Sequence, residues 1–185
     1  MNKFLLHVRN QLAMIRVLVH NIVYNLIPFF VFKNLYLRWT GTKIGKHSYV
    51  HTRTRFTYPG RLIIGDNCTI NFGCHLDVRG YLSIGNNVMI GHDCKVYTCG
   101  HDLDDDNFGG LDKEVIIEDN VVIFPNALIM PGVTISKNAV ILNGSVVTKN
   151  VEPDNIVGGN PAKFVRKRNA NPKYKLDYKY WFINS

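Results

Sequence analysis

A histidine opens the longest stretch of the chain that departs from an otherwise regular pattern. His101 lies in the segment VYTCGHDLDDDNFGGLDKEV, residues 96–115. An imidazole accepts a proton near neutral pH, which is what general-base catalysis requires. Loops on a rigid scaffold often carry catalytic groups. We therefore take His101 as the candidate catalytic base, against the simpler alternative of a polar surface residue.

The acidic run after this histidine resembles a calcium-binding loop but lacks essential parts of one. Asp102, Asp104 and Asp106 have the spacing of the first ligands of such a loop. However, Asn107 occupies the glycine position, and Lys113 replaces the glutamate at the twelfth position. We expect the run to shape the mouth of an acceptor site or to be solvated.

A period of six residues dominates the rest of the chain and defines the scaffold for this loop. Aliphatic residues recur at every sixth position, and a small or β-branched residue follows each by four. Neither an α-helix nor an ordinary strand has this period, whereas a triangular coil with three short faces per turn does. Such repeats close a core only by stacking. In the clearest block the aliphatic positions are Ile117, Ile123, Ile129, Ile135, Ile141 and Val147, and the small positions are Val121, Ala127, Val133, Ala139, Ser145 and Val151.

The period also sets the expected domain organisation. A chain of 185 residues is expected to form one continuous core. We expect an amphipathic helix and connector over residues 1–40 and a catalytic β-helix over 41–165, interrupted by a loop at 97–116. Residues 166–185 are expected to form a basic and aromatic tail.

The cysteines and histidines do not form a disulfide or zinc pattern. No CxxC pair occurs, and Cys68, Cys74 and Cys94 fall on the small inward positions, where a thiol packs as a small apolar group. Zinc needs several convergent ligands, and the histidines, including His75 and His92, offer no close pair. We expect no metal, and free thiols suit a reducing cytoplasm.

The charge balance favours anionic partners. The formal net charge is +8, from 22 Lys and Arg against 14 Asp and Glu. Such a balance suits nucleotide phosphates, nucleic acid or a membrane surface. Aromatic residues are not interleaved with the basic ones along the coil, so we expect no nucleic-acid partner. A basic group lies near the C-terminus, at Lys163, Arg166, Lys167, Arg168, Lys173 and Lys175.

The first forty residues carry the apolar stripe of an amphipathic helix. Pro28 is expected to end or kink this helix. A signal peptide is disfavoured because polar residues interrupt the apolar stretch, and a membrane span because Arg16 and His20 would lie in hydrocarbon. Protein, either the coil or a neighbouring subunit, is the favoured cover for the stripe, and a membrane surface is the alternative. The stripe consists of Val8, Leu12, Ile15, Val19, Ile22 and Leu26.

Four segments resemble the hexapeptide-repeat acyltransferases, in particular the maltose and galactoside O-acetyltransferases and the capsule and colanic-acid O-acetyltransferases. The resemblance covers about residues 40–168 and implies an all-β fold, a left-handed parallel β-helix with an N-terminal α-helix and a short C-terminal extension. The segments are INF at 70–72, YTCGH at 97–101, PGVTI at 131–135 and VGGNPAK at 157–163.

The resemblance also implies a reaction and its residues. It implies direct transfer from acetyl-CoA to a sugar hydroxyl in a homotrimer with active sites at the seams, without a metal. The family's loop histidine, the base, matches His101, and its acceptor-binding asparagine, thirty residues earlier, matches Asn71. The matching CoA positions are Asn143, Thr148, Lys149, Gly159, Lys163 and Arg166.

The sequence leaves the acceptor open. The aromatic tail at 174–182 resembles those of polysaccharide-modifying members, which favours a sugar of a bacterial surface polysaccharide or its precursor. An amino sugar, an antibiotic, and a non-catalytic β-helix scaffold are the alternatives. We expect a cytoplasmic protein, with peripheral contact at the inner membrane through the N-terminal helix as an alternative.

Overall fold

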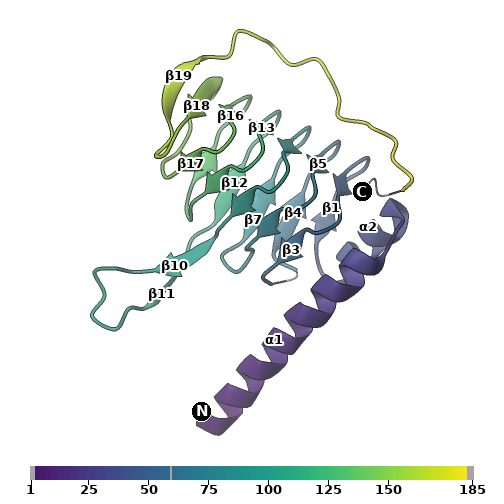
Figure 1. The fold of residues 1–185 in the computed structure, drawn as a ribbon, viewed down its shortest axis with the longest axis vertical. Coiled ribbons are helices and arrows are strands. Elements are labelled where there is room, and N and C mark those ends of the chain that lie inside the picture. The colour runs from purple at the N-terminus through teal and green to yellow at the C-terminus, as the bar shows by residue number, and fades with distance from the viewer. Residues whose placement is uncertain (1–2, 59, 183–185) are drawn as a thin grey trace.

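The computed structural model describes residues 3–58 and 60–182, and in them two helices precede a three-sided coil of short strands (Figure 1). Helix α1 spans Lys3–Leu26 and α2 spans Phe30–Trp39. The predicted parallel β-helix is confirmed. The strands are β1 (Lys43–Ile44), β2 (Tyr49–Val50), β3 (Arg55–Phe56), β4 (Leu62–Ile64), β5 (Thr69–Ile70), β6 (His75–Leu76), β7 (Leu82–Ile84), β8 (Met89–Ile90), β9 (Lys95–Val96), β10 (Cys99–His101), β11 (Gly110–Asp112), β12 (Val115–Ile117), β13 (Val122–Ile123), β14 (Leu128–Ile129), β15 (Thr134–Ile135), β16 (Val140–Ile141), β17 (Val146–Val147), β18 (Asn155–Gly158) and β19 (Lys163–Lys167).

Successive turns of the coil stack strand on strand. The first sheet has the order β1-β4-β7-β12-β15, the second β2-β5-β8-β13-β16-β18 with β19 added at its end, and the third β3-β6-β9-β14-β17. Pairing between the turns of the coil is parallel, so that Ile123 aligns with Ile90 and Ile141 of the adjacent turns. We call the turn from a second-sheet strand to a third-sheet strand the second–third corner. The turn from the third sheet back to the first is the third–first corner.

The repeat positions form the core, as predicted. The six aliphatic residues of the clearest block are at most 1% exposed, and the six small ones at most 4%. Cys68, Cys74 and Cys94 are also fully buried and unpaired. Burial raises the pKa of the Cys68 thiol to about 11, as expected for a packing thiol rather than a reactive one. Asn120 and Asn126 adopt left-handed φ angles of 59° and 61° at turns between strands, a conformation that asparagine tolerates well.

Polar and aromatic side chains join the N-terminal helices to the coil. Helix α1 ends at Leu26, just before Pro28, as predicted. Tyr24 is fully buried, and its hydroxyl donates to the Val50 carbonyl at 2.5 Å. The Asn21 side chain donates to the carbonyl of Phe56 and accepts from its N–H, both at 2.8 Å. Asn21 therefore satisfies backbone groups at the exposed edge of β3, as a neighbouring strand would.

A buried lysine lies in the same junction. Lys33 of α2 is 0% exposed, and its Nζ lies 4.0 Å from the centre of the Tyr24 ring. A cation over an aromatic face is attracted by the ring quadrupole, which offsets part of the cost of burial. Burial nevertheless lowers the pKa of Lys33 to about 8.

The coil of the same chain does not cover the predicted apolar stripe of α1. Its six residues are 37–75% exposed. Of the two protein covers expected for this stripe, the chain's own coil is therefore wrong, because the side of α1 that carries Asn21 and Tyr24 faces the coil. A neighbouring subunit as the cover stays a prediction. No helix in the described part of the chain is long and apolar enough to cross a membrane.

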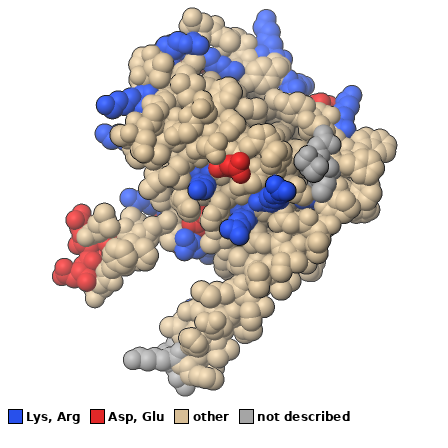
Figure 2. All heavy atoms as spheres, viewed as in Figure 1, with Lys and Arg blue, Asp and Glu red and all other residues tan. Residues whose placement is uncertain are grey.

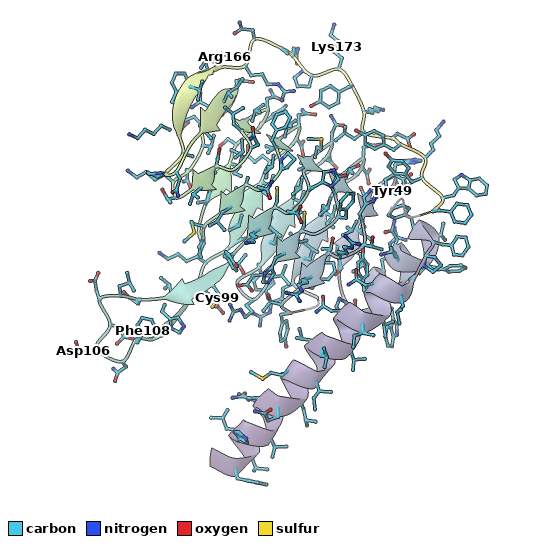
Figure 3. All side chains as sticks on the ribbon, viewed as in Figure 1. Tyr49, Cys99, Asp106, Phe108, Arg166 and Lys173 are labelled. Carbon is cyan, nitrogen blue, oxygen red and sulfur yellow. The ribbon has the colours of Figure 1, made fainter. Side chains whose placement is uncertain are left out.

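The C-terminal segment returns along the coil to the helices (Figures 1 and 3). β19 first folds back antiparallel on β18. The tail is then held by Asn87, whose side chain donates to the Tyr174 carbonyl and accepts from the Leu176 N–H, both at 2.9 Å. Near its end, the Trp181 carbonyl accepts a hydrogen bond from the Phe30 N–H at 3.4 Å. The tail thus brings late aromatic residues to the start of α2.

Candidate active site

The hairpin β10–β11 carries the candidate base and leaves the coil at the third–first corner. Its strands are antiparallel, with His101 opposite Gly110. Figure 1 shows the hairpin as an arm that projects from the coil, and in the chain it lies between β9 and β12. The expected loop at 97–116 is therefore largely a two-stranded arm.

Aspartates shape the tip of this arm through local hydrogen bonds. The Asp105 carboxylate accepts hydrogen bonds from the backbone N–H groups of Asn107 at 2.9 Å and Gly109 at 3.0 Å. These bonds lower the pKa of Asp105 because they stabilise its charged form. The Asp102 carboxylate accepts from the Asp104 N–H at 3.0 Å. Within the described part of the chain, no three His, Cys, Asp or Glu residues are grouped to hold a metal.

His101 is held in the tautomer that a general base needs. Its Nδ1 lies 2.9 Å from the carbonyl oxygen of Phe108. A carbonyl can only accept, so Nδ1 carries the proton and Nε2 presents a lone pair. The imidazole is exposed, and its ring stacks on that of Phe108 with centroids 4.3 Å apart and planes 5° from parallel. A substrate hydroxyl can therefore reach Nε2.

Phe108 is a site residue that sequence reasoning missed. It orients His101 both through its carbonyl and through its ring. Its backbone has a left-handed φ of 49°, which is uncommon for a bulky residue. Its position just before the glycine pair at 109–110 predicts a turn, but not the fold-back that brings residue 108 against residue 101.

Asn71 lies at the second–third corner, immediately after β5. Its side-chain amide donates to the carbonyl of Ile90 at 3.0 Å, and the residue is half-buried. This bond ties Asn71 to the next turn of the coil. His101, by contrast, leaves from the third–first corner. The width of the third sheet separates the two corners, so a single chain does not bring these residues together.

The predicted CoA positions are also divided between corners. Thr148 and Lys149 follow β17 at the third–first corner, whereas Asn143 and Gly159 follow β16 and β18 at the second–third corner. All four are exposed, and Gly159 has a φ of +99° that favours glycine. Lys163 and Arg166 lie exposed on β19; Figure 3 labels Arg166. A single chain therefore does not gather the six residues into one groove.

A groove of about 1080 Å³ lies between α1 and the coil, beside the third–first corner from which the hairpin leaves. Met14, Val17 and Leu18 line it from the helix, and Arg53 and Arg55 line it from the coil, beside Arg79, which is ion-paired with Asp77 at 2.9 Å. It is therefore apolar on one side and basic on the other. The sequence did not predict this groove because its walls come from segments that meet only in the folded chain.

Two histidines considered as zinc ligands lie apart in different environments. His75 also lines the groove, and its Nε2 lies 3.0 Å from the Thr57 hydroxyl. Burial lowers the pKa of His75, which favours its neutral form. His92 instead packs against the Phe72 ring, with centroids 4.0 Å apart.

The chain is similar to known proteins both in its hexapeptide repeat and in its fold. The model of the bacterial transferase hexapeptide family (six repeats) matches residues 114–149. A galactoside O-acetyltransferase of Escherichia coli is 32% identical over 141 residues, covering 74% of this chain and 70% of the relative. A second E. coli protein, provisionally named a colanic acid biosynthesis acetyltransferase, WcaF, is 29% identical over 132 residues, covering 71% and 72%.

Among solved structures, a hexapeptide-repeat acetyltransferase of Vibrio cholerae complexed with acetyl coenzyme A superposes with a TM-score of 0.79. The two chains are 28% identical, and the match covers 86% of this chain and 89% of that one. Together with the coil and its loop histidine, these similarities show that the chain belongs to the hexapeptide-repeat acetyltransferases, related to the maltose and galactoside O-acetyltransferases and to WcaF.

Proposed function

We propose that this acetyltransferase moves the acetyl group of acetyl-CoA to a sugar hydroxyl of a bacterial surface polysaccharide or its precursor. The observation that carries the proposal is the hydrogen bond from His101 Nδ1 to the Phe108 carbonyl, which leaves Nε2 free to accept a proton. The galactoside and colanic-acid names of the relatives favour a sugar acceptor.

His101 would act twice in the reaction. Its Nε2 takes the proton of the sugar hydroxyl as the sugar oxygen bonds to the thioester carbonyl carbon. When the C–S bond breaks, the same nitrogen returns the proton to the departing CoA sulfur. The acetyl group ends on the sugar and the thiol is restored, so atoms and charge balance without a metal or an acyl-enzyme.

We further propose a homotrimer in which neighbouring copies complete each site. Asn71 and His101 lie at opposite corners of the third sheet, so a neighbouring copy would place Asn71 near His101. Head-to-tail contacts that close after three copies would create three equivalent seams. The same arrangement would gather the divided CoA positions, with Lys149, Lys163 and Arg166 supplying cations for the phosphates of CoA.

The groove beside the hairpin supports an acceptor that carries negative charge. Arg53 and Arg55 line its basic side, and phosphate-linked sugar precursors are anionic. We place the reaction in the cytoplasm.

An antibiotic acceptor is a second candidate, because a chloramphenicol acetyltransferase of E. coli is 44% identical over 70 residues, although these cover only 33% of that protein.

Thiol release from acetyl-CoA, measured with a panel of acceptors, tests the activity. The panel should include free sugars, nucleotide- and lipid-linked sugars, an amino sugar and chloramphenicol. His101→Ala should lower turnover by about 10²- to 10⁴-fold, the usual effect of removing a general base. Its thermal unfolding should match the wild type, and His7→Ala, at an exposed histidine of α1, is the matched control. Near wild-type turnover by His101→Ala on the best acceptor would refute its role.

Mixing two inactive variants tests the shared site. Asn71→Ala should weaken transfer more than CoA binding measured by calorimetry. In trimers assembled from equal amounts of His101→Ala and Asn71→Ala subunits, about one seam in four should combine both intact residues. Activity should return to roughly that fraction of wild type. Mixed trimers with no recovered activity would refute a site shared between subunits.

A further inference from the structure

Helices α1 and α2 each expose a series of large apolar side chains. The largest exposed fractions are 75% for Leu26 and 82% for Trp39. Soluble monomers rarely expose apolar patches of this extent without a binding function. The outward residues include Leu5, Leu12, Ile15, Val19 and Leu26 on α1, and Val31, Phe32, Leu35 and Trp39 on α2, whereas Leu18 and Ile22 are exposed at the rim of the groove.

The exposed apolar side of α1 lies opposite the side that binds the coil. At 3.6 residues per turn, Ile15, Val19 and Leu26 lie across the helix from Val17 and Tyr24. Arg9 and Arg16 border the stripe, where long side chains can keep their charge in water while their stems cover apolar surface. This is the pattern of a helix that lies in the plane of a membrane surface.

Charge is distributed very unevenly along the chain. Ten of the 22 Lys and Arg residues lie before position 66, and none of the 14 Asp and Glu residues does. The first 65 residues therefore carry a formal charge of +10, and the remainder carries −2. Figure 2 shows basic groups where α1 meets the coil and no acidic group on the helix. The end of the molecule with the exposed apolar residues is thus complementary to an anionic surface.

Aromatic residues extend the apolar side at the junction of the helices. The Phe182 ring lies 5.0 Å from that of Phe29, and the two residues form a backbone bridge. Trp39 and Trp181, the two tryptophans of the sequence, are 82% and 78% exposed. Tryptophan is enriched at the interface between bilayer and water, where its ring contacts both phases.

We propose that the outer side of α1 and α2, with the aromatic end of the tail, docks on the surface of an anionic phospholipid bilayer. The helices lie along the surface and do not cross it. Apolar burial and attraction between the basic N-terminal region and lipid phosphates both contribute. In the view of Figure 1, the hairpin projects to the left of the coil and the free end of α1 extends below it, so docking through the outer side of α1 leaves the catalytic arm uncovered.

Vesicle flotation tests this docking with a charge-matched pair of variants. Wild-type protein should float with vesicles of equal parts phosphatidylglycerol and phosphatidylcholine, less with phosphatidylcholine alone, and less as salt is raised. Ile15→Glu should weaken binding by about tenfold to a hundredfold, because it loses one buried side chain. Ala13→Glu adds the same charge on the other side of α1 and should bind nearly as wild type.

Tryptophan fluorescence provides a readout that needs no variant. Emission of the wild type should shift to shorter wavelength on addition of anionic vesicles, and lipids brominated along their acyl chains should quench it. Absence of flotation and of this shift, or equal flotation of Ile15→Glu and wild type, would overturn the proposal.

Light scattering without lipid distinguishes a membrane from a second copy of the chain. The Ile15→Glu variant should keep the wild-type oligomeric mass and its turnover on a soluble acceptor. A lower mass would show instead that α1 packs on a neighbouring subunit. Vesicle binding is independent of His101, so failure of this proposal leaves the catalytic one standing, and the reverse also holds.

Discussion

Ile123 in the coil and Ile15 in α1 are the same residue type in opposite situations. Ile123 is 0% exposed and stacks between Ile90 and Ile141 of adjacent turns, whereas Ile15 is 56% exposed. Both belong to regular apolar patterns in the sequence. In the coil the pattern marks the interior of the chain. In α1 the polar and aromatic side faces the coil, and the apolar side remains available.

The difference comes from what each period requires. A coil with three faces per turn encloses a single interior, so one residue of each repeat must be buried in that interior. A helical period shows only that one side is apolar, and burial against the same chain is one way among several to cover it. The hairpin that carries His101 follows neither period. It projects from the coil and is held by hydrogen bonds between its own two strands and by the contact of His101 with Phe108. Four predictions test these contrasts, from the largest expected effect to the smallest.

Truncating the two isoleucines should give very different losses of stability. Ile123→Ala should lower the free energy of unfolding by about 2–5 kcal/mol, because it leaves a cavity in a packed core. Ile15→Ala should change it by about 0.5 kcal/mol or less in the absence of lipid. Denaturant unfolding of both variants measures the difference. Similar losses would show that α1 buries its stripe against protein in solution.

Asn21→Ala should detach α1 from the edge of the coil. The variant leaves the N–H and carbonyl of Phe56 without their partner and should cost about 1–3 kcal/mol. Hydrogen exchange at the Phe56 amide should accelerate. Gln11→Ala, at an exposed position of the same helix, is the control. Equal behaviour of the two variants would mean that Asn21 contributes little to holding the helix.

Phe108→Ala should impair catalysis without unfolding the coil. The variant keeps the backbone carbonyl that binds His101 Nδ1 but removes the ring that stacks on it. Loss of this positioning should lower kcat by about tenfold, or ~1.4 kcal/mol. Thermal unfolding should stay as in the wild type. Full activity would show that the carbonyl alone orients the base.

Acid should weaken the junction between the helices and the coil. Burial, together with Arg16, lowers the pKa of His20 to about 4, against an ordinary value of 6.5. As pH falls from about 6.5 towards 4, the unfolded state binds the proton first, so stability present above this window is lost within it.

Replacing this histidine tests that effect. His20→Phe should lessen the fall in Tm between pH 7 and pH 5 by about 2–4 °C, the shift that ~1 kcal/mol gives in a chain of this size. Identical pH profiles for variant and wild type would refute the contribution of His20. Burial also lowers the pKa of His51 to about 4, so protonation of His51 destabilises the fold over the same pH range. This contribution of His51 should remain in the His20→Phe variant.

The candidate site shows which features a sequence motif predicts and which it does not. The loop position of His101 predicts a base, but its tautomer depends on the Phe108 carbonyl seven residues later, and no local rule predicts that contact. Asn71 and His101 are predicted to share a site at a subunit seam, and within one chain they lie at the two corners that flank the third sheet. Spacing along the chain gives the turn on which a residue lies, whereas distance across a subunit seam depends on assembly.

The sequence by itself determined the coil, its inward residues, the buried cysteines and the end of α1 before Pro28. These follow from periods and local backbone preferences, which are properties of neighbouring residues. Only the tertiary structure decided which side of α1 meets the coil, how the tail reaches α2, and where the basic and apolar walls of the groove come together. Those features depend on contacts such as that of Asn21 with Phe56, and the energies of such contacts exist only once distant segments are packed together.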